Sequence, residues 1–486
     1  MGRVLKPKSW IVFKGFIERV GITHSNIRLG GQDGTMPKED DDAKKASNKS
    51  SKKKTMKVSN QIPKKRRREI EKALDKHEAS RPEWDRLSGA KQHRFFGRRI
   101  KPGSIRQIEL PLLDTKLGDS WPSPVTVIHG RRPGPTITIT GGVHGDEMVG
   151  QVVCSLLSQT VFTGPGRPLD PELMAGTIRL APVLNPPGLA RQMRYFPDGR
   201  DLNREFPGSE TGSTTGRVAF RILNNLIEGS DFLLDLHTAA SGRDNLPQIR
   251  ADLAHPPSNR IARAFGIEVI LDSKGPKGSM RRAAVRKEIG SLTYEGGGAN
   301  LADHEAVQIA IHGVMNILRS LHVIPGHPAR PKFRLLASGS TWVRADEGGL
   351  VDLFVGRGSY VEAGEIIGRI VDPQRPHESA DIISPSRGLF ICTANNPIVS
   401  PGTPVGHLLP ITRGARVIRK GLNKKTNRLI VSGSKGEPVW REDFEVEEIS
   451  IEGEWSGGAV DAEWQKNWTQ ANGGVNSIAA EEEDAD

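Results

Sequence analysis

The chain has 486 residues, of which 36% are hydrophobic, and it carries a formal net charge of +12 at pH 7. Residues 1–110 hold 29 Lys and Arg against 13 Asp and Glu, whereas the remaining residues sum to −4, so the basic character belongs to the N-terminal segment alone. No apolar run approaches the ~20 residues that span a membrane, and the apolar stretch within residues 1–21 is too short and too interrupted by charges for a convincing signal peptide. These features exclude a membrane-spanning protein, and we expect a cytoplasmic one.

Residues 1–90 are predicted to form a basic, largely disordered arm, because they show no sustained hydrophobic periodicity. The basic cluster at residues 64–68 is of a kind that contacts nucleic acid or acidic surfaces. A solvated basic tail is the favoured interpretation, since the sequence has no zinc-finger spacing and no recognisable nucleic-acid module. Cys154 and Cys392 lie far apart within apolar runs, which indicates buried free thiols in a reducing compartment.

From Ile105 onward, strand-like and helix-like stretches alternate. Isoleucine and threonine alternate over residues 136–140, as in a buried strand, and the run stops at Gly141 and Gly142 before an apolar, helical stretch begins near Glu147. Such alternation implies an α/β sheet covered on both faces, here over residues 105–325. The other predicted elements are strands at 105–112, 125–128, 177–184, 231–236, 268–271 and up to 295, helices at 216–228, 257–265 and 303–320, and a long loop at 189–215.

Two of the predicted strands lead into a histidine. His144 and Glu147 follow the strand at 136–140, and His237 ends the apolar run that begins at residue 231. Sites in open α/β sheets form outside the carboxyl ends of the strands. A His and a carboxylate three residues apart can reach one metal ion, and His237 completes a ligand set of catalytic zinc that leaves a fourth position open. A turn histidine and a carboxylate at a helix start are the structural alternative for the first pair.

After Pro325 the sequence predicts only strands. Two segments, which begin at Gly349 and Gly388, both contain the later pattern Val-x-x-Gly-x-x-x-Gly, and this indicates an internal repeat. A small all-β barrel-sandwich domain of the biotinyl/lipoyl type, at residues 333–410, fits this repeat. Neither hairpin tip offers the Lys that a carrier domain needs, so shaping the enzyme mouth is the favoured role. Residues 411–486 are predicted to be a basic β extension followed by an acidic disordered tail.

Four motifs in this order resemble the succinylglutamate desuccinylase/aspartoacylase family, a branch of the zinc carboxypeptidase superfamily. The resemblance covers roughly residues 105–410, and the ordered combination is more specific than any single motif. It implies a zinc-carboxypeptidase-like mixed sheet flanked by helices, with one Zn²⁺ bound by the two histidines and the glutamate. The motifs are Gly-Gly-Val-His-Gly-Asp-Glu at 141–147, Asp-Leu-Asn-Arg-Glu-Phe-Pro-Gly at 201–208, Leu-Asp-Leu-His at 234–237 and Tyr-Glu-Gly-Gly at 294–297.

A zinc hydrolase also needs a carboxylate that takes a proton from water and returns it to the leaving amine. Glu295 matches the catalytic Glu of the family, whereas a solvated turn residue is the structural alternative. Glu288 and Glu305 are the other candidate bases. Asp235 and Asp146 are expected to orient the ligand imidazoles, although hydration at a turn would also explain Asp146.

The predicted loop at 189–215 contains arginines that could bind an anionic substrate. The resemblance implies that Asn203 and Arg204 hold the carboxylate of the substrate, and a planar guanidinium suits that task because it binds carboxylate in a bidentate way. Arg194 is the candidate that polarises the scissile carbonyl.

The sequence therefore predicts a zinc-dependent amidohydrolase that acts on carbon–nitrogen bonds other than peptide bonds. Its expected partner is a small N-acyl amino acid, or a related acylated amine with a carboxylate, and the products are a carboxylate and a free amine. The first alternative is a metallocarboxypeptidase that acts on a peptide or cell-wall peptide, and the second is a non-catalytic binding protein. A serine hydrolase is disfavoured because Gly-x-Ser-x-Gly is absent. The acyl group, the amine and the oligomeric state are not specified by the sequence.

Overall fold

The structure is a computed structural model that describes residues 90–114, 120–160, 162–164, 166–434 and 446–451. All of these residues belong to one compact unit, residues 68–486. Residues 1–89 of the predicted arm and the acidic tail after residue 451 lie outside the described residues. Among the described residues, no helix is both long enough and apolar enough to cross a membrane.

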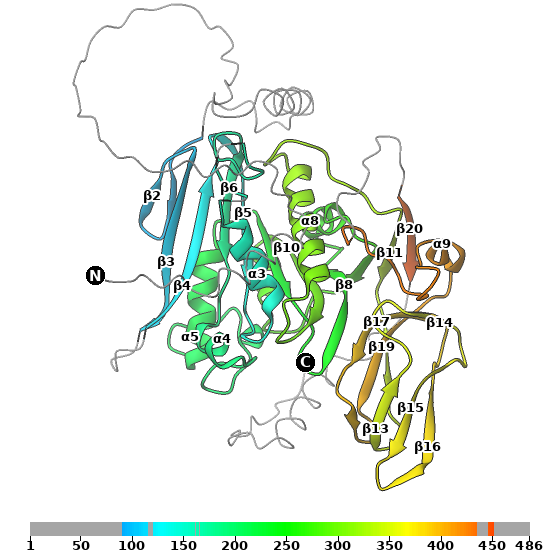
Figure 1. Ribbon diagram of the computed structural model, residues 1–486. Helices are drawn as coiled ribbons and strands as arrows, with labels where there is room; N and C mark the ends of the chain where they lie inside the picture. Colours follow the sequence, from blue (N-terminus) through cyan, green and yellow to red (C-terminus); the bar gives the residue numbers. More distant parts are fainter. Residues whose placement is uncertain (1–89, 115–119, 161, 165, 435–445, 452–486) are drawn as a thin grey trace, which may run out of the picture. The chain divides into compact units, whose positions relative to one another are not determined.

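A 14-stranded mixed sheet organises the fold (Figure 1). Its neighbouring strands follow the order β12-β19-β17-β8-β10-β7-β5-β6-β4-β3, and β9, β11, β14 and β20 join this path. Strands β6, β5, β7 and β10 are parallel neighbours, so their carboxyl ends meet at one edge. In the α/β part the bounds are β3 (Ser104–Asp114), β4 (Ser120–His129), β5 (Arg132–Gly141), β6 (Ala175–Ala181), β7 (Phe232–His237), β8 (Arg243–Ala251), β9 (Val269–Asp272) and β10 (Gly290–Gly298), and a separate hairpin comprises β1 (His93–Phe95) and β2 (Arg98–Ile100).

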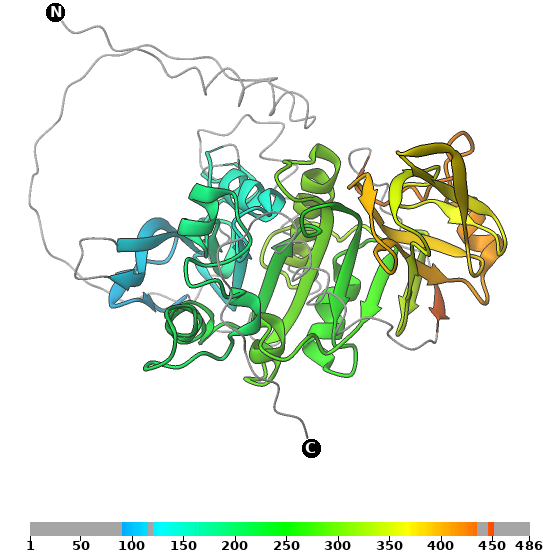
Figure 2. The same cartoon turned by 90° about the horizontal axis from the view of Figure 1, so that it is seen from below.

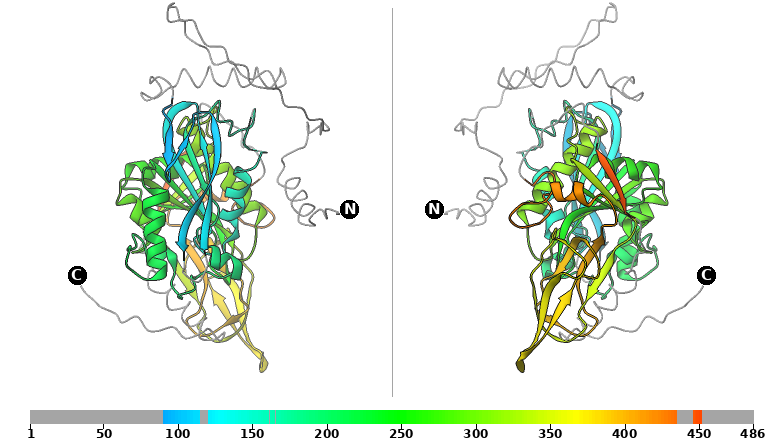
Figure 3. Two further views of the ribbon diagram at one scale, coloured as in Figure 1. Left: turned by 90° about the vertical axis from the view of Figure 1, so that its left-hand side faces the viewer. Right: turned by 90° about the vertical axis from the view of Figure 1, so that its right-hand side faces the viewer.

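Helices cover both faces of this sheet (Figures 2 and 3). On one face, α8 contacts both α3 and α6, and on the other face α7 contacts the π-helical segment η3 that continues α5. The mixed sheet with helices on both faces is the α/β architecture predicted from the alternating pattern. The helical bounds are α3 (Met148–Leu157), α4 (Pro186–Arg191), η2 (Leu202–Arg204), α5 (Thr214–Arg221), η3 (Ile222–Ile227), α6 (Pro256–Ala264), α7 (Met280–Val285), α8 (His304–Ser320) and α9 (Ala415–Lys420).

The β5–α3 junction brings the first motif against the end of β7. Residues 137–140 are all fully buried, because β5 lies between β6 and β7 and helices cover both its faces. A Cβ on Gly141 would lie 2.4 Å from the carbonyl carbon of Gly150, and one on Gly150 would lie 2.3 Å from the carbonyl oxygen of Leu236. Only glycine permits such an approach. Helix α3 therefore packs directly on the strands, with its N-terminus beside His237.

Several sequence-based expectations differ from the structure. Strand β8 and helix α7 were not predicted, because both stretches are rich in Arg and polar residues. The expected loop at 189–215 includes η2 and the start of α5. The β extension predicted after residue 410 is interrupted by helix α9, which forms between Gly414 and Gly421, whereas strand β20 (Glu447–Ile451) lies within the predicted extension.

Residues 333–410 form strands, as predicted, and their repeat is visible in the pairing. The first strand of each half pairs with the short strand of the other half, β13 with β18 and β14 with β17. Part of the region is continuous with the main sheet, because β11 pairs with β9 and β17 pairs with β8, whereas β16, β15, β13 and β18 form a separate four-stranded sheet. The predicted boundary at 333 therefore coincides with no break in the sheet. The bounds are β11 (Phe333–Ala337), β12 (Thr341–Arg344), β13 (Gly349–Leu353), β14 (Tyr360–Val361), β15 (Ile366–Asp372), β16 (Arg375–Ile383), β17 (Gly388–Ala394), β18 (Ile398–Val399), β19 (Pro404–Pro410) and β20 (Glu447–Ile451).

Candidate metal and catalytic site

His144, Glu147 and His237 converge at the carboxyl ends of β5 and β7. One ligand atom of each side chain lies within 4.8 Å of the others, and all three residues are buried. The Nδ1 atoms of both histidines face the glutamate, at 2.6 Å from Oε1 for His144 and 2.8 Å from Oε2 for His237. The backbone N–H of Thr238 also donates to Glu147 Oε2 at 3.1 Å. The three residues predicted to bind metal therefore lie together, with their donor atoms directed at one point.

Each histidine has a carboxylate at its far nitrogen. His237 Nε2 lies 2.7 Å from Asp235 Oδ2, as expected from the sequence. His144 Nε2 lies 3.0 Å from Asp201 Oδ1. The expectation that Asp146 orients an imidazole is wrong, because the ring nitrogens face Glu147, Asp201 and Asp235, and the buried Oδ1 of Asp146 has no hydrogen-bond partner. A carboxylate behind each imidazole orients the ring and directs Nδ1 toward the centre of the cluster.

The electrostatics of the cluster favour a shared positive charge. Burial alone raises the pKa of Glu147, but the two imidazoles outweigh it and hold that pKa well below the usual value. Burial alone lowers the pKa of His237, but Asp235 and Glu147 outweigh it and raise that pKa well above the usual value. The negative charge of the buried Glu147 therefore favours a positive charge between the two imidazoles, supplied by protons or by a metal ion.

Arg194 lies beside this cluster. Its Nη1 donates to Glu147 Oε1 at 2.9 Å, and its Nε and Nη2 donate to Asp201 Oδ2 at 3.1 and 2.9 Å. Burial opposes the charge of Arg194, but these carboxylates outweigh burial and raise its pKa. Arg194 is therefore held in one orientation next to His144, with Nη1 3.2 Å from Nδ1 of that ring.

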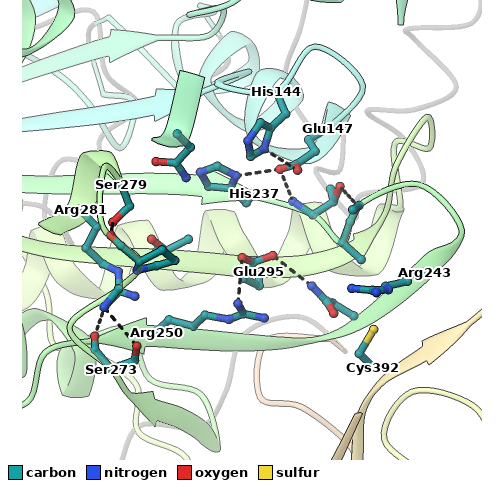
Figure 4. Close-up of a pocket in the computed structure, with 18 of the residues that line it drawn as sticks. His144, Glu147, His237, Arg243, Arg250, Ser273, Ser279, Arg281, Glu295 and Cys392 are labelled. Carbon is teal, nitrogen blue, oxygen red and sulfur yellow. Dashed lines mark hydrogen bonds and ion pairs between the residues drawn. The ribbon is translucent and has the colours of Figure 1, made fainter. Parts of the chain in front are cut away.

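Glu295 faces the cluster from β10, whose residue 295 is in register with His237 of β7 (Figure 4). Asn245 Nδ2 donates to Glu295 Oε2 at 3.0 Å, and Arg250 Nη1 lies 3.7 Å from Oε1. Burial raises the pKa of Glu295, and the charge of Arg250 partly opposes this. The other two candidate bases do not face the cluster. The side chain of Glu288 is 88% exposed, and Glu305 pairs with Arg357.

A cavity of about 490 Å³ connects these groups and also contains Asn203 and Arg204. Arg204 is exposed to it, and its Nη1 donates to the neighbouring carbonyl of Asn203 at 3.0 Å. The side-chain oxygen of Asn203 instead accepts from the backbone N–H of Met280 at 2.8 Å, which ties the loop to the start of α7. All seven residues predicted for the site therefore line one cavity.

Sequence reasoning missed other residues of this cavity. Asp201 belongs to one of the four motifs, but no role was predicted for it. For Arg243 and Arg250, the only indication in the sequence was the presence of two arginines within the stretch that forms β8. Trp342, Cys392 and His407 come from the β-rich region, and no sequence pattern indicated that they reach the site. Both cysteines are free and buried, as predicted.

Comparisons with known proteins agree with this geometry. The sequence model of the succinylglutamate desuccinylase/aspartoacylase catalytic domain matches residues 133–321. The chain is 30% identical over 264 residues to the N-alpha-acetyl-L-2,4-diaminobutyric acid deacetylase of Halomonas elongata, which covers 52% of this chain and 75% of that protein. It is 34% identical over 124 residues to the N-acyl-aromatic-L-amino acid amidohydrolase (carboxylate-forming) of Rattus norvegicus, and the match covers 23% of this chain and 35% of that protein.

The fold agrees as well. The crystal structure of a succinylglutamate desuccinylase/aspartoacylase from Rhodobacter sphaeroides matches with a TM-score of 0.55 and 27% identity, covering 63% of this chain and 95% of that one. The matched relatives are hydrolases of N-acyl amino acids by name, and the solved structure shares the mixed α/β sheet. The chain therefore belongs to the succinylglutamate desuccinylase/aspartoacylase family.

Proposed function

We propose that this chain is a zinc-dependent amidohydrolase that removes the acyl group from a small N-acyl amino acid. The observation that carries the proposal is the convergence, in one cavity, of a buried His₂Glu donor set with Glu295. Two relatives are named for hydrolysis of the same kind of bond.

His144, Glu147 and His237 would hold the metal. Two imidazoles and one carboxylate are a donor set of catalytic zinc, and the carboxylate of the buried Glu147 lies between the two rings. When bound, zinc polarises the acyl carbonyl and makes water more acidic. Asp235 and Asp201 keep both imidazoles in the orientation in which Nδ1 can bind the ion.

Glu295 is the proposed general base. Its carboxylate, held by Asn245, faces the cluster across the cavity and takes a proton from the attacking water. The same proton then passes to the amine nitrogen as the amide bond breaks, so the products are one carboxylate and one amine. The raised pKa of Glu295 brings the group closer to neutral pH, where a base that must also act as an acid works best. Arg194 and Arg204 would bind the carbonyl and the carboxylate of the substrate.

A substrate panel tests this proposal. The zinc-loaded full chain is incubated with N-acyl amino acids of varied acyl group, and with peptides that have a free C-terminus, and released amines are quantified and identified by mass spectrometry. We expect free amino acids from the N-acyl compounds and no release from the peptides. Cleavage of peptides alone would indicate a metallocarboxypeptidase. Binding without turnover of any compound would indicate a binding protein.

A further inference from the structure

The hydrogen bond from Asn245 to Glu295 is made where the pairing of β8 with β10 is irregular. Glu295 is opposite Gln248, and Gly297 is opposite Asn245. Between these two pairs β8 has two residues and β10 has one, which is a β-bulge. One of the two residues is Pro247, which has no N–H to donate. The position of Asn245 relative to Glu295 therefore depends on what holds β8 beyond the bulge.

The neighbouring residue of β8, Asp244, is held from the other face of the sheet by Arg357. Successive residues of a strand point to opposite faces, so Asp244 points away from the cavity that Asn245 lines. Arg357 comes from the turn between β13 and β14 in the β-rich region, and its Nη1 donates to Asp244 Oδ1 at 2.6 Å. The side chain of Arg357 is only 17% exposed, so the contact is largely shielded from water.

The same guanidinium group holds β10 through the start of α8. Arg357 Nη1 lies 2.7 Å from Asp303 Oδ2, and the other oxygen of Asp303 accepts from the backbone N–H of Ala306 at 3.0 Å, which caps the helix. A Cβ on Gly297 would lie 3.0 Å from the Cβ of Asp303, so this cap packs directly on β10. Arg357 therefore joins the strand that carries Asn245 to the strand that carries Glu295.

Charge makes this junction depend on the guanidinium. Burial lowers the pKa of Arg357, but Asp303 and Asp244 outweigh burial and raise it. Burial and, to a smaller extent, the charge of Asp303 raise the pKa of Asp244, although Arg357 opposes both. Without the guanidinium, the two carboxylates would repel each other across the junction. The repulsion would act on β8 at the residue next to Asn245.

We propose that Arg357 is a positioning residue for the general base. It acts from the face of the sheet opposite the cavity, through Asp244 and Asp303, and it contacts neither the cluster nor the substrate. With the two carboxylates joined, Asn245 Nδ2 stays within hydrogen-bond distance of Glu295 Oε2 and keeps that carboxylate directed at the cluster. This inference rests on the proposed function, and it gives the β-rich region a part in catalysis.

Steady-state kinetics of the zinc-loaded full chain test the positioning. In Arg357→Gln we expect kcat to fall roughly 10–100-fold, because a displacement of about 1 Å at a reacting group has an effect of this size. KM and zinc content should stay close to the wild type. Arg357→Lys should recover part of kcat, because an ammonium can still donate to both carboxylates. Arg369→Gln is the matched control and should keep the wild-type kcat, since Arg369 pairs with Asp381 at 2.9 Å within the separate four-stranded sheet.

A double-mutant cycle distinguishes positioning from support of the whole fold. Glu295→Gln leaves no base to position, so Arg357→Gln should lower the residual kcat of that variant no further. A second loss as large as the loss in the wild-type background would overturn the inference. Calorimetric melting checks that each variant is folded at the assay temperature. If Arg357→Gln does not fold, Asp244→Asn takes its place in the same cycle, because it removes the charge that Arg357 holds on β8.

Proton exchange separates this inference from the proposed hydrolysis. NMR of the full chain labelled with ¹⁵N-asparagine follows the side-chain amide of Asn245, which is assigned by its loss in Asn245→Ala. Exchange of that amide with water should be faster in Arg357→Gln than in the wild type and in Arg369→Gln, because the hydrogen bond to Glu295 is lost. Equal exchange rates in the three proteins would overturn the inference. If no amide substrate is cleaved but the difference in exchange persists, the positioning stands and the proposed function fails.

Discussion

Asp201→Asn tests how the metal ligands are held. The carboxylate of Asp201 accepts from Arg194 Nε and Nη2 at 3.1 and 2.9 Å and from the backbone N–H of Asn203 at 2.8 Å, and it lies 3.0 Å from His144 Nε2. Its side chain is only 10% exposed. An asparagine of the same size removes the charge and can satisfy Arg194 or His144 but not both, because its amide offers one acceptor atom.

Two effects of different size follow. Loss of one partner of a buried ion pair costs about 3–5 kcal/mol, and the remaining contact of Arg194 with Glu147 places this case near 3 kcal/mol. Loss of the carboxylate behind a ligand histidine weakens metal binding by roughly 10–100-fold. We therefore expect a lower melting temperature in the metal-free protein and, separately, a higher Kd for zinc.

The assay is a competition titration of zinc against a chromogenic chelator, combined with calorimetric melting of the metal-free protein. Asp146→Asn is the control, since Asp146 is a neighbouring buried carboxylate that contacts neither imidazole. That variant should bind zinc as the wild type does. A Kd for zinc in Asp201→Asn within twofold of the wild type would refute the reasoning that Asp201 orients His144.

Two further predictions concern charge. Arg204→Ala should lower kcat/KM for an N-acyl amino acid roughly 10–150-fold in steady-state kinetics. Arg204→Lys should recover only part of this loss, because an ammonium cannot form two parallel hydrogen bonds to a carboxylate. An equal loss of kcat/KM on the α-carboxamide of the substrate would contradict this prediction. Burial raises the pKa of Glu268 from 4.5 to about 7 although Ser432 donates to it. The folded state therefore binds this proton more tightly than the unfolded state does. The resulting contribution to the free energy of unfolding, about 3 kcal/mol, is present below pH 4.5 and lost as the pH rises through about 7. Glu268→Gln should unfold at higher urea concentration than the wild type at pH 8 but not at pH 4.5, and identical midpoints at pH 8 would contradict this assignment.

The sequence predicted the parts of the site that stand on regular, apolar strands. His144 and His237 follow stretches whose hydrophobicity alone indicates buried strands, and parallel neighbours bring their ends together. Glu295 was found through its motif. The catalytic sheet was predictable because its strands and helices alternate in the chain.

The missed parts depend on contacts between distant segments. Strand β8 carries two arginines, at 243 and 250, and no apolar run that would mark a buried strand. It is buried because β10, β9 and β17 pair with it. Trp342 and His407 reach the cavity because β17 continues the catalytic sheet, and no local pattern predicts such pairing. Asp201 bonds to His144 across 57 residues of sequence, so its role appears only in the folded chain.

The most direct test of the account measures zinc and turnover in one sample of Glu295→Gln. Glutamine preserves the shape of the side chain and an acceptor for Asn245 but cannot take a proton. We predict one zinc per chain, as in the wild type, and a kcat on the best N-acyl amino acid that is ~10²–10⁴-fold lower. Turnover within a few-fold of the wild type, at full zinc content, would contradict the claim that Glu295 is the base of a metal-dependent amidohydrolase.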